Sequence, residues 1–202
     1  AYVATVGVMS LVTASALGGV DRAVWRFFVH HEFLVSFAKL YTQWGVMSIL
    51  SPLALLVGIA MFMKYRLVAV AIIPMVSLQV NDVLTASAKA FFDVVRPPQS
   101  EWLAGAGGGS FPSGHTANTT AFVIAVVLVV AFRTSGRTAR RQMFFVAALI
   151  VSLMGWSRLA LNVHWLSDVL AGWVLGSSTA FACVLIVMKL ARIAPVRQID
   201  GT

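Results

Sequence analysis

The most regular feature of the sequence is a series of long apolar runs separated by short polar or Gly- and Pro-containing connections. A helix needs about 20 apolar residues to cross the hydrocarbon core of a membrane. The runs predict six membrane-spanning helices over residues 1–19, 43–63, 67–88, 113–132, 143–161 and 166–188. Between the first two runs, over residues 21–43, apolar positions recur at helical spacing among charged ones. This pattern predicts an amphipathic helix lying in the membrane interface.

The composition supports an all-α integral membrane protein built as a six-helix bundle. Hydrophobic residues make up 59% of the 202 positions and charged residues 11%, which excludes most classes of soluble globular protein. Because six spans leave only short connections, residues 1–202 are interpreted as a single domain. The run that begins at Ala1 is interpreted as a first span, with a cleaved signal peptide near Ala14-Ser15-Ala16 as the alternative.

The net charge of +8 is assigned to the membrane rather than to nucleic acid. Basic residues at the ends of spans are favoured on the cytoplasmic side during insertion. Both termini are therefore expected in the cytoplasm of a multi-pass protein of the cell membrane. On this topology the basic loop over residues 133–141 is a signal for orientation, with attraction of anionic lipids as a secondary consequence. Cys183 stands alone, so no disulfide framework is expected.

The same topology brings three polar clusters to the outer face of the membrane. Residues 89–97 follow the third predicted span, residues 112–115 open the fourth, and residues 157–168 join the fifth to the sixth. Two crossings separate the second cluster from the third, and an even number of crossings returns the chain to the same side. The sequence therefore predicts that all three clusters converge on one site that faces the periplasm or the exterior.

The first two clusters offer groups that could hold an anion. Lys89 and Arg96 are seven residues apart, so both would lie on one face of a helix that ends at Pro97. Taken alone, such cations more often snorkel toward lipid headgroups. Ser113 is suited to cap the fourth span, and Gly114 would let a ligand approach the N–H groups of the helix start. An ordinary cap beside an interfacial His fits this second cluster equally well.

The third cluster contains a pair that could form an activated nucleophile. His164 and Asp168 stand at positions i and i+4, so the carboxylate can hold the proton of one ring nitrogen and leave the lone pair of the other free. A buried His–Asp pair can also simply satisfy its own hydrogen bonds. Arg158 would return to this cluster if the chain bends between Leu161 and His164. Fixed cations without a set of carboxylates for a divalent metal suit phosphoryl transfer.

In order and spacing, the three clusters resemble the signature motifs of the type 2 phosphatidic acid phosphatase (PAP2) superfamily. The matching residues are Lys89, Arg96-Pro97, Pro112-Ser113-Gly114-His115, Ser157-Arg158, His164 and Asp168. The resemblance implies that His164 attacks phosphorus to form a phosphohistidine, that Asp168 orients it, and that His115 protonates the leaving oxygen. It also implies that no metal or other cofactor is needed, and that phosphate is held by Lys89, Arg96, Ser113, Gly114 and Arg158.

Two positions depart from the family pattern. Val94 stands where many members carry an Arg, and Asn162 stands where a Gly is common. Neither change removes a catalytic group, although Val94 weakens the case for binding a second phosphate.

The expected function is hydrolysis of a lipid phosphomonoester or diphosphate at the outer face. Phosphatidate, phosphatidylglycerol phosphate and polyprenyl diphosphates all remain candidate substrates. The expected partners are this lipid phosphate and the membrane lipids, with no nucleic acid, and the oligomeric state is open. Two alternatives are a lipid phosphotransferase that uses the same His164 and a non-catalytic protein that binds lipid phosphates.

Three further features lie outside the motifs. Asp82, inside the third predicted span, is either the partner of a buried ion pair or a polar contact between helices. The glycine-rich stretch over residues 105–109 is expected to act as a flexible lid. Gly172 and Gly176 form a pair of small residues that predicts close helix packing within the bundle.

Overall fold

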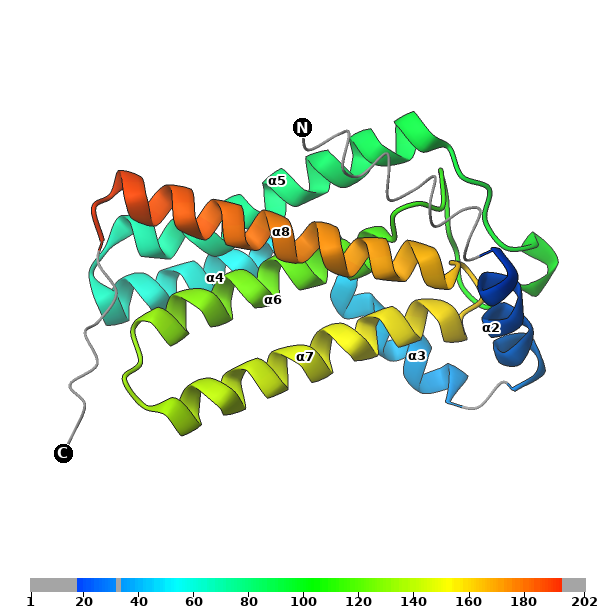
Figure 1. Ribbon diagram of the computed structural model, residues 1–202, viewed down its shortest axis with the longest axis horizontal. Coiled ribbons are helices and arrows are strands. Elements are labelled where there is room, and N and C mark those ends of the chain that lie inside the picture. Colours follow the sequence, from blue (N-terminus) through cyan, green and yellow to red (C-terminus); the bar gives the residue numbers. More distant parts are fainter. Residues whose placement is uncertain (1–17, 32–33, 194–202) are drawn as a thin grey trace.

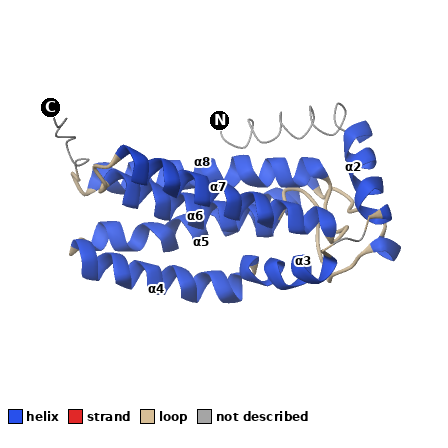
Figure 2. Ribbon diagram, turned by 90° about the horizontal axis from the view of Figure 1, so that it is seen from below, coloured by secondary structure: helices blue, strands red, loops and turns tan. Residues whose placement is uncertain are grey.

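The computed structural model describes residues 18–31 and 34–193, and every regular element in these ranges is helical. The elements are α2 (Gly18–His30), α3 (Val35–Thr42), the 3₁₀ helix η1 (Gln43–Gly45), α4 (Met47–Tyr65), α5 (Val68–Phe92), the 3₁₀ helix η2 (Gln99–Glu101), α6 (Gly114–Phe132), α7 (Arg137–Ala160) and α8 (Leu166–Leu190). The five long helices run roughly along one axis, and α2 lies across one end of the bundle (Figures 1 and 2).

Five of the predicted spans correspond to α4, α5, α6, α7 and α8. Each of these helices is long enough and apolar enough to cross a membrane. The largest difference in a boundary is at α7, which begins at Arg137 rather than at residue 143. The predicted first span, residues 1–19, falls outside the described residues apart from its last two positions. Five predicted helices are therefore confirmed, and the sixth span stays a prediction.

The segment predicted as one amphipathic helix over residues 21–43 is two helices. α2 ends at His30, and α3 begins after Leu34, whose φ of 59° is left-handed and cannot continue an α-helix. The apolar residues of both helices pack onto the end of α7 and the connection that follows it. Phe28 of α2 and Ala38 of α3 share one buried cluster with that segment. Contact with the bundle therefore decides the conformation here, rather than one continuous apolar face.

α6 lies at the centre of the bundle. It contacts α5, α7 and α8, and it is the most buried of the five long helices. Two glycines of α8 allow the closest approach, because a methyl group at Gly172 would lie 3.0 Å from Thr116 Cβ and one at Gly176 would lie 2.7 Å from Thr120 Cβ. The predicted packing of this glycine pair within the bundle is confirmed.

A polar network joins α5 to α6 inside the bundle. Asn118 donates a hydrogen bond to Asp82 Oδ1 at 2.7 Å, and Asn81 donates one to Asn118 Oδ1 at 2.6 Å. Within the described part of the chain, the only close pairing of a basic side chain with a carboxylate is His164 with Asp168, so Asp82 has no basic partner there. Of the two interpretations of Asp82, the polar contact between helices is therefore confirmed.

The connections between the long helices are divided between the two ends of the bundle. Those from α5 to α6 and from α7 to α8 lie at the end that α2 crosses, whereas those from α4 to α5 and from α6 to α7 lie at the opposite end (Figure 1). Residues 89–97, 112–115 and 157–168 consequently all lie at the α2 end. The predicted convergence on one end of the bundle is confirmed, and the side of the membrane that this end faces stays a prediction.

Replacing Gly176 by Val should destabilise the bundle, because the new side chain would collide with Thr120 and Ala121 of α6. Overpacking of this kind costs about 1–3 kcal/mol. In a chain of this size each kcal/mol lowers the unfolding temperature by roughly 2–4 °C, which thermal unfolding in detergent would measure. Gly105→Val is the matched control, since no atom lies within 4 Å of a methyl group at Gly105. An unchanged unfolding temperature for G176V would contradict the close packing of α6 against α8.

Candidate active site

The connection from α7 to α8 turns the chain back toward the bundle. α7 ends at Ala160, and Asn162 adopts a left-handed φ of 57° before α8 begins at Leu166. The predicted bend between Leu161 and His164 is confirmed. Asn tolerates the left-handed region better than most residues other than Gly, so Asn162 can serve at a position where the motif commonly has Gly.

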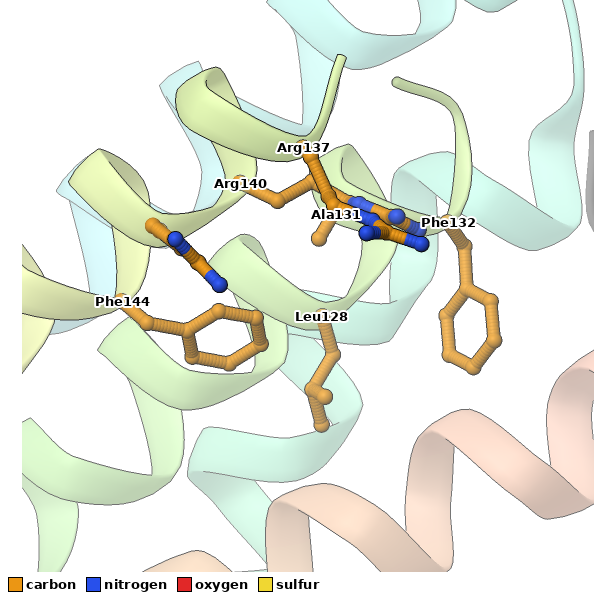
Figure 3. A pocket seen from close by; sticks show the side chains of 7 residues that line it. Leu128, Ala131, Phe132, Arg137, Arg140 and Phe144 are labelled. Carbon is orange, nitrogen blue, oxygen red and sulfur yellow. The ribbon is translucent and has the colours of Figure 1, made fainter. Parts of the chain in front are cut away.

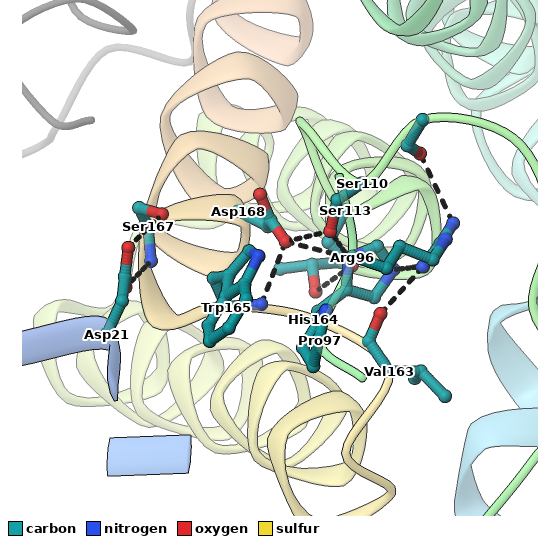
Figure 4. A network of polar contacts seen from close by, with 12 residues as sticks. Asp21, Arg96, Pro97, Ser110, Ser113, Val163, His164, Trp165, Ser167 and Asp168 are labelled. Atoms are coloured by element: carbon teal, nitrogen blue, oxygen red, sulfur yellow. Dashed lines mark hydrogen bonds and ion pairs between the residues drawn. The ribbon is translucent and has the colours of Figure 1, made fainter. Parts of the chain in front are cut away.

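A buried carboxylate holds the imidazole of His164 (Figure 4). His164 Nδ1 lies 3.1 Å from Asp168 Oδ2, and both side chains are almost fully buried. The same oxygen accepts a hydrogen bond from the backbone N–H of Trp165 at 2.8 Å and another from the Ser110 hydroxyl. Because the carboxylate accepts, Nδ1 is the protonated nitrogen of His164, and Nε2 carries the free lone pair.

Arg96 faces this lone pair from the α5–α6 connection. Its Nη1 lies 3.1 Å from His164 Nε2 and donates to Val163 O at 2.7 Å. Arginine can only donate hydrogen bonds, so Nε2 is the acceptor. Other guanidinium N–H groups of Arg96 donate to the carbonyls of Gly107, Gly108 and Gly109. The guanidinium is therefore fixed beside the nitrogen that the sequence predicts to be the nucleophile.

Lys89 reaches the same glycine-rich loop by a different route from the one predicted. The prediction that Lys89 and Arg96 share a face of a helix ending at Pro97 is wrong. α5 ends at Phe92, where Asp93 adopts a left-handed φ of 40°, so Arg96 lies in the following loop. Lys89 Nζ donates to Gly109 O at 2.6 Å, and this carbonyl also accepts from Arg96. The stretch predicted as a lid thus holds both cations through its backbone.

The start of α6 presents backbone N–H groups to the same region. Ser113 is the N-cap residue, as predicted, but its side chain does not bond to the helix backbone. Its hydroxyl instead accepts from Thr116 Oγ1 at 3.1 Å, and its own N–H donates to Asp168 O at 3.0 Å. A methyl group at Gly114 would lie 3.8 Å from Lys89 Cε. The uncapped helix start therefore lies next to a cation, an arrangement that favours anions.

Arg158 and His115 complete the group of predicted site residues. Arg158 is buried near the end of α7, and its Nη1 donates to Thr42 Oγ1 at 2.5 Å. Its Nε is buried without a hydrogen-bond partner, which leaves this donor for a ligand. His115 lies in the first turn of α6, directly after Gly114. A methyl group at Gly45 would lie 3.0 Å from His115 Cδ2, so Gly45 provides space for that ring.

Sequence reasoning missed several residues that support the site. Asp21 of α2 accepts hydrogen bonds from Ser167 N at 2.9 Å and Ser167 Oγ at 2.7 Å, across 146 positions of the sequence. It thereby fixes the first turn of α8 one residue before Asp168. Thr42 holds Arg158, and Ser110 holds Asp168. No motif marks these residues, because their importance arises only from contacts distant in the sequence.

The site concentrates positive charge around a neutral imidazole. Burial lowers the pKa of His164 well below its ordinary value of 6.5, and repulsion by the neighbouring cations Arg158, Arg96 and Lys89 adds to this shift. Burial also lowers the pKa of Arg96. His164 is consequently unprotonated at neutral pH and chemically able to act as a nucleophile. Among the residues that the structure describes, no three His, Cys, Asp or Glu side chains are grouped to hold a metal ion.

Comparison with known proteins identifies relatives of this chain. The model of the PAP2 superfamily matches residues 70–192. Phosphatidylglycerophosphatase B of Bacillus subtilis strain 168 is 32% identical over 137 residues, which cover 67% of this chain and 66% of that protein. Undecaprenyl-diphosphatase of Sulfolobus acidocaldarius is 29% identical over 91 residues, which cover 45% of this chain and 38% of that protein. Each match spans less than two thirds of the relative's own length.

Two solved structures share the fold. The crystal structure of a transmembrane PAP2-type phosphatidylglycerolphosphate phosphatase from Bacillus subtilis matches with a TM-score of 0.82 at 24% identity, covering 94% of this chain and 98% of that chain. The crystal structure of Aquifex aeolicus LpxE matches with a TM-score of 0.61 at 23% identity, covering 84% of this chain and 95% of that chain. The helical arrangement is therefore that of a known transmembrane phosphatase fold.

We expect His164 to titrate below pH 6.5 in the substrate-free protein, because burial and the surrounding cations disfavour the imidazolium. The ring nitrogen shifts of histidine-labelled protein in detergent would report the midpoint, with the signal assigned by its loss in His164→Ala. Arg96→Gln should raise the midpoint, since it removes a cation 3.1 Å from Nε2. Arg137→Gln, at the opposite end of the bundle, is the matched control. A midpoint at or above 6.5 in the unsubstituted protein would contradict this account.

Proposed function

The chain belongs to the PAP2 superfamily, and from that premise we propose that it is an integral membrane lipid phosphatase acting through a phosphohistidine at His164. The observation that carries the proposal is the position of His164, held by Asp168 on one side and facing Arg96 at 3.1 Å on the other. Relatives named as a phosphatidylglycerophosphatase and an undecaprenyl-diphosphatase support a lipid monophosphate or diphosphate as the substrate class.

In the proposed first step, Nε2 of His164 attacks phosphorus in line with the lipid oxygen. A P–N bond forms as the P–O bond to the lipid breaks, and positive charge develops on the imidazole. Asp168 Oδ2, 3.1 Å from Nδ1, stabilises that charge and prevents the ring from rotating. The contacts from Ser110 and Trp165 N–H keep the carboxylate itself in place.

The cations are assigned to the non-bridging oxygens of the transferred phosphoryl group. Arg96 Nη1 now donates to Nε2, and an incoming phosphate oxygen would accept that hydrogen bond in its place. Arg158 has a buried Nε without a partner, and Lys89 lies beside Gly114 at the helix start. Fixed donors of this kind stabilise the charge of the phosphoryl-transfer transition state, and they do so more strongly in a site that excludes water than the same groups would in bulk water. Ser113 and the N–H groups of the first turn of α6 complete the proposed cradle.

His115 is assigned the proton transfers. In the first step it gives a proton to the departing lipid oxygen, which leaves as an alcohol or as a lipid phosphate. In the second step it takes a proton from water, whose oxygen attacks phosphorus as the P–N bond to His164 breaks. Inorganic phosphate is released and both imidazoles return to their starting states. The position of His115 in the first turn of α6, directly after Gly114 of the proposed cradle, supports this role.

We also propose that the site faces the exterior and that both termini lie in the cytoplasm, with residues 1–202 acting as one domain. The support is the charge at the opposite end of the bundle, where, among the described residues, basic side chains follow or precede the spans without neighbouring carboxylates. The residues of this set are Lys64, Arg66, Arg133, Arg137, Arg140, Arg141, Lys189 and Arg192.

His164→Ala should abolish release of inorganic phosphate, by about 10³-fold or more, because the covalent step has no substitute nucleophile. Release would be measured with purified protein on phosphatidate, phosphatidylglycerol phosphate and a polyprenyl diphosphate. His31→Ala is the control, since His31 is an exposed residue whose ring bonds to Phe27 O. Activity should persist in the presence of a chelator.

Full retained activity in H164A with normal folding would defeat the mechanism. A phosphorylated enzyme trapped by acid quench supports the covalent step. Transfer of labelled phosphate to a second lipid, without phosphate release, would favour a phosphotransferase over a phosphatase. The absence of both products for every lipid would favour a binding protein without catalysis.

His115→Ala should slow phosphoenzyme formation by about 10²–10⁴-fold with a lipid ester, whose alkoxide leaves poorly without a proton. The loss should be much smaller with an aryl phosphate, because a phenolate leaves without protonation. Rapid-quench measurement of phosphoenzyme isolates this step from the later hydrolysis. Equal losses with both leaving groups would show that His115 does not act as the general acid.

A further inference from the structure

A cavity lies at the end of the bundle away from His164, between α6 and α7 (Figure 3). Its volume is about 570 Å³, within the range of pockets that hold organic ligands. The residues that define its character are Leu128, Phe132, Phe144, Arg137, Arg140 and Arg141. Figure 3 shows the guanidinium groups of Arg137 and Arg140 over Leu128 and beside Phe132. The cavity therefore combines cationic side chains with an apolar wall.

Among the described residues, no carboxylate of the adjoining helices offsets the positive charge of this cavity. α6, α7 and the loop between them contain no Asp or Glu. The three arginines lie in the first two turns of α7, where the helix dipole disfavours cations. Neighbouring cations along one helix also repel one another. A bound anion would relieve both unfavourable interactions.

The apolar wall distinguishes a lipid from a soluble anion. Inorganic phosphate would use only the guanidinium groups and would make no contact with the cavity-facing surfaces of Leu128, Phe132 and Phe144. A phospholipid presents a phosphate directly attached to its glycerol backbone and acyl chains, so it would satisfy both parts of the lining. The cavity also lies at the end of two membrane spans, which is the depth at which headgroups are found.

We propose that this cavity binds an anionic phospholipid from the leaflet opposite the catalytic cluster. Its phosphate contacts Arg137, Arg140 and Arg141, and the first carbons of its acyl chains pack on Leu128, Phe132 and Phe144. None of the lining residues is a nucleophile or a general base, so the lipid is bound and not turned over. Because it contacts both α6 and α7, its binding stabilises their packing at this end.

The test uses the purified, delipidated full chain in a neutral detergent. Phosphatidylglycerol is the probe, phosphatidylcholine controls for the tails and for a phosphate without net charge, and sodium phosphate controls for a soluble anion. Native mass spectrometry counts bound lipid, and the unfolding temperature reports stabilisation. The triple substitution Arg137→Gln, Arg140→Gln and Arg141→Gln should weaken phosphatidylglycerol binding by at least about tenfold and remove its effect on unfolding temperature.

The matched control is the triple substitution Arg66→Gln, Lys189→Gln and Arg192→Gln. These exposed residues lie at the same end and carry the same charge, but they do not line the cavity. Phosphatidylglycerol binding in the control should change less than about twofold. Both triples keep the catalytic cluster, so lipid bound at His164 contributes equally to each. If the cavity triple does not fold, Arg140→Gln alone should weaken binding by about fivefold relative to Arg66→Gln.

Three results would overturn the proposal. Equal losses in the two triples would show attraction to the whole basic end rather than to the cavity. Binding of phosphatidylcholine as tight as that of phosphatidylglycerol would show that the arginines are not used. Displacement of the lipid by millimolar sodium phosphate would show a site for soluble anions.

Discussion

The site depends on the contacts of Asp168, because they join segments that are far apart in the sequence. Its Oδ2 accepts from His164, from the Trp165 N–H and from Ser110, while its backbone oxygen accepts from Ser113 N–H at the start of α6. One residue therefore fixes the imidazole, the end of the glycine-rich loop and the helix start relative to one another. A buried charge is tolerable only with several such donors, so the network and the burial require each other.

The cations of the site are held by neutral dipoles rather than by carboxylates. Backbone carbonyls of the glycine-rich loop accept from Lys89 and Arg96, and a hydroxyl accepts from Arg158. Carbonyls and hydroxyls fix the position of a cation without cancelling its charge. The positive potential is therefore preserved for an anion, which is the electrostatic requirement for stabilising a phosphoryl group in transit. Pairing with Asp or Glu would have fixed the same side chains and removed that potential.

The sequence could predict the features that depend on hydrophobic periodicity and on whether the number of membrane crossings is even or odd. Apolar runs located five helices, and counting crossings placed three motifs at one end, because neither inference needs knowledge of loop conformation. The end of α5 at Phe92 could not be predicted from Pro97, because the left-handed Asp93 ends the helix earlier. Asp21 was equally hidden, since only the position of α2 across the bundle end brings it to Ser167. Local rules fail where a contact distant in the sequence decides the conformation.

The two ends of the bundle differ in the groups that lie near their cationic side chains. At the α2 end, backbone carbonyls and a hydroxyl accept from the cations, and Asp168 and the described carboxylates of the loops and of α2 lie at the same end. At the other end, Arg137 and its neighbours have no carboxylate on either adjoining helix. Most of the excess positive charge of the described residues therefore lies at the end that carries Arg137. Because α6 and α7 reach both ends, the same two helices carry His115 and Arg158 at one and an arginine-lined cavity at the other. An anion bound at the cavity would stabilise the packing of α6 against α7, the two helices that position His115 and Arg158.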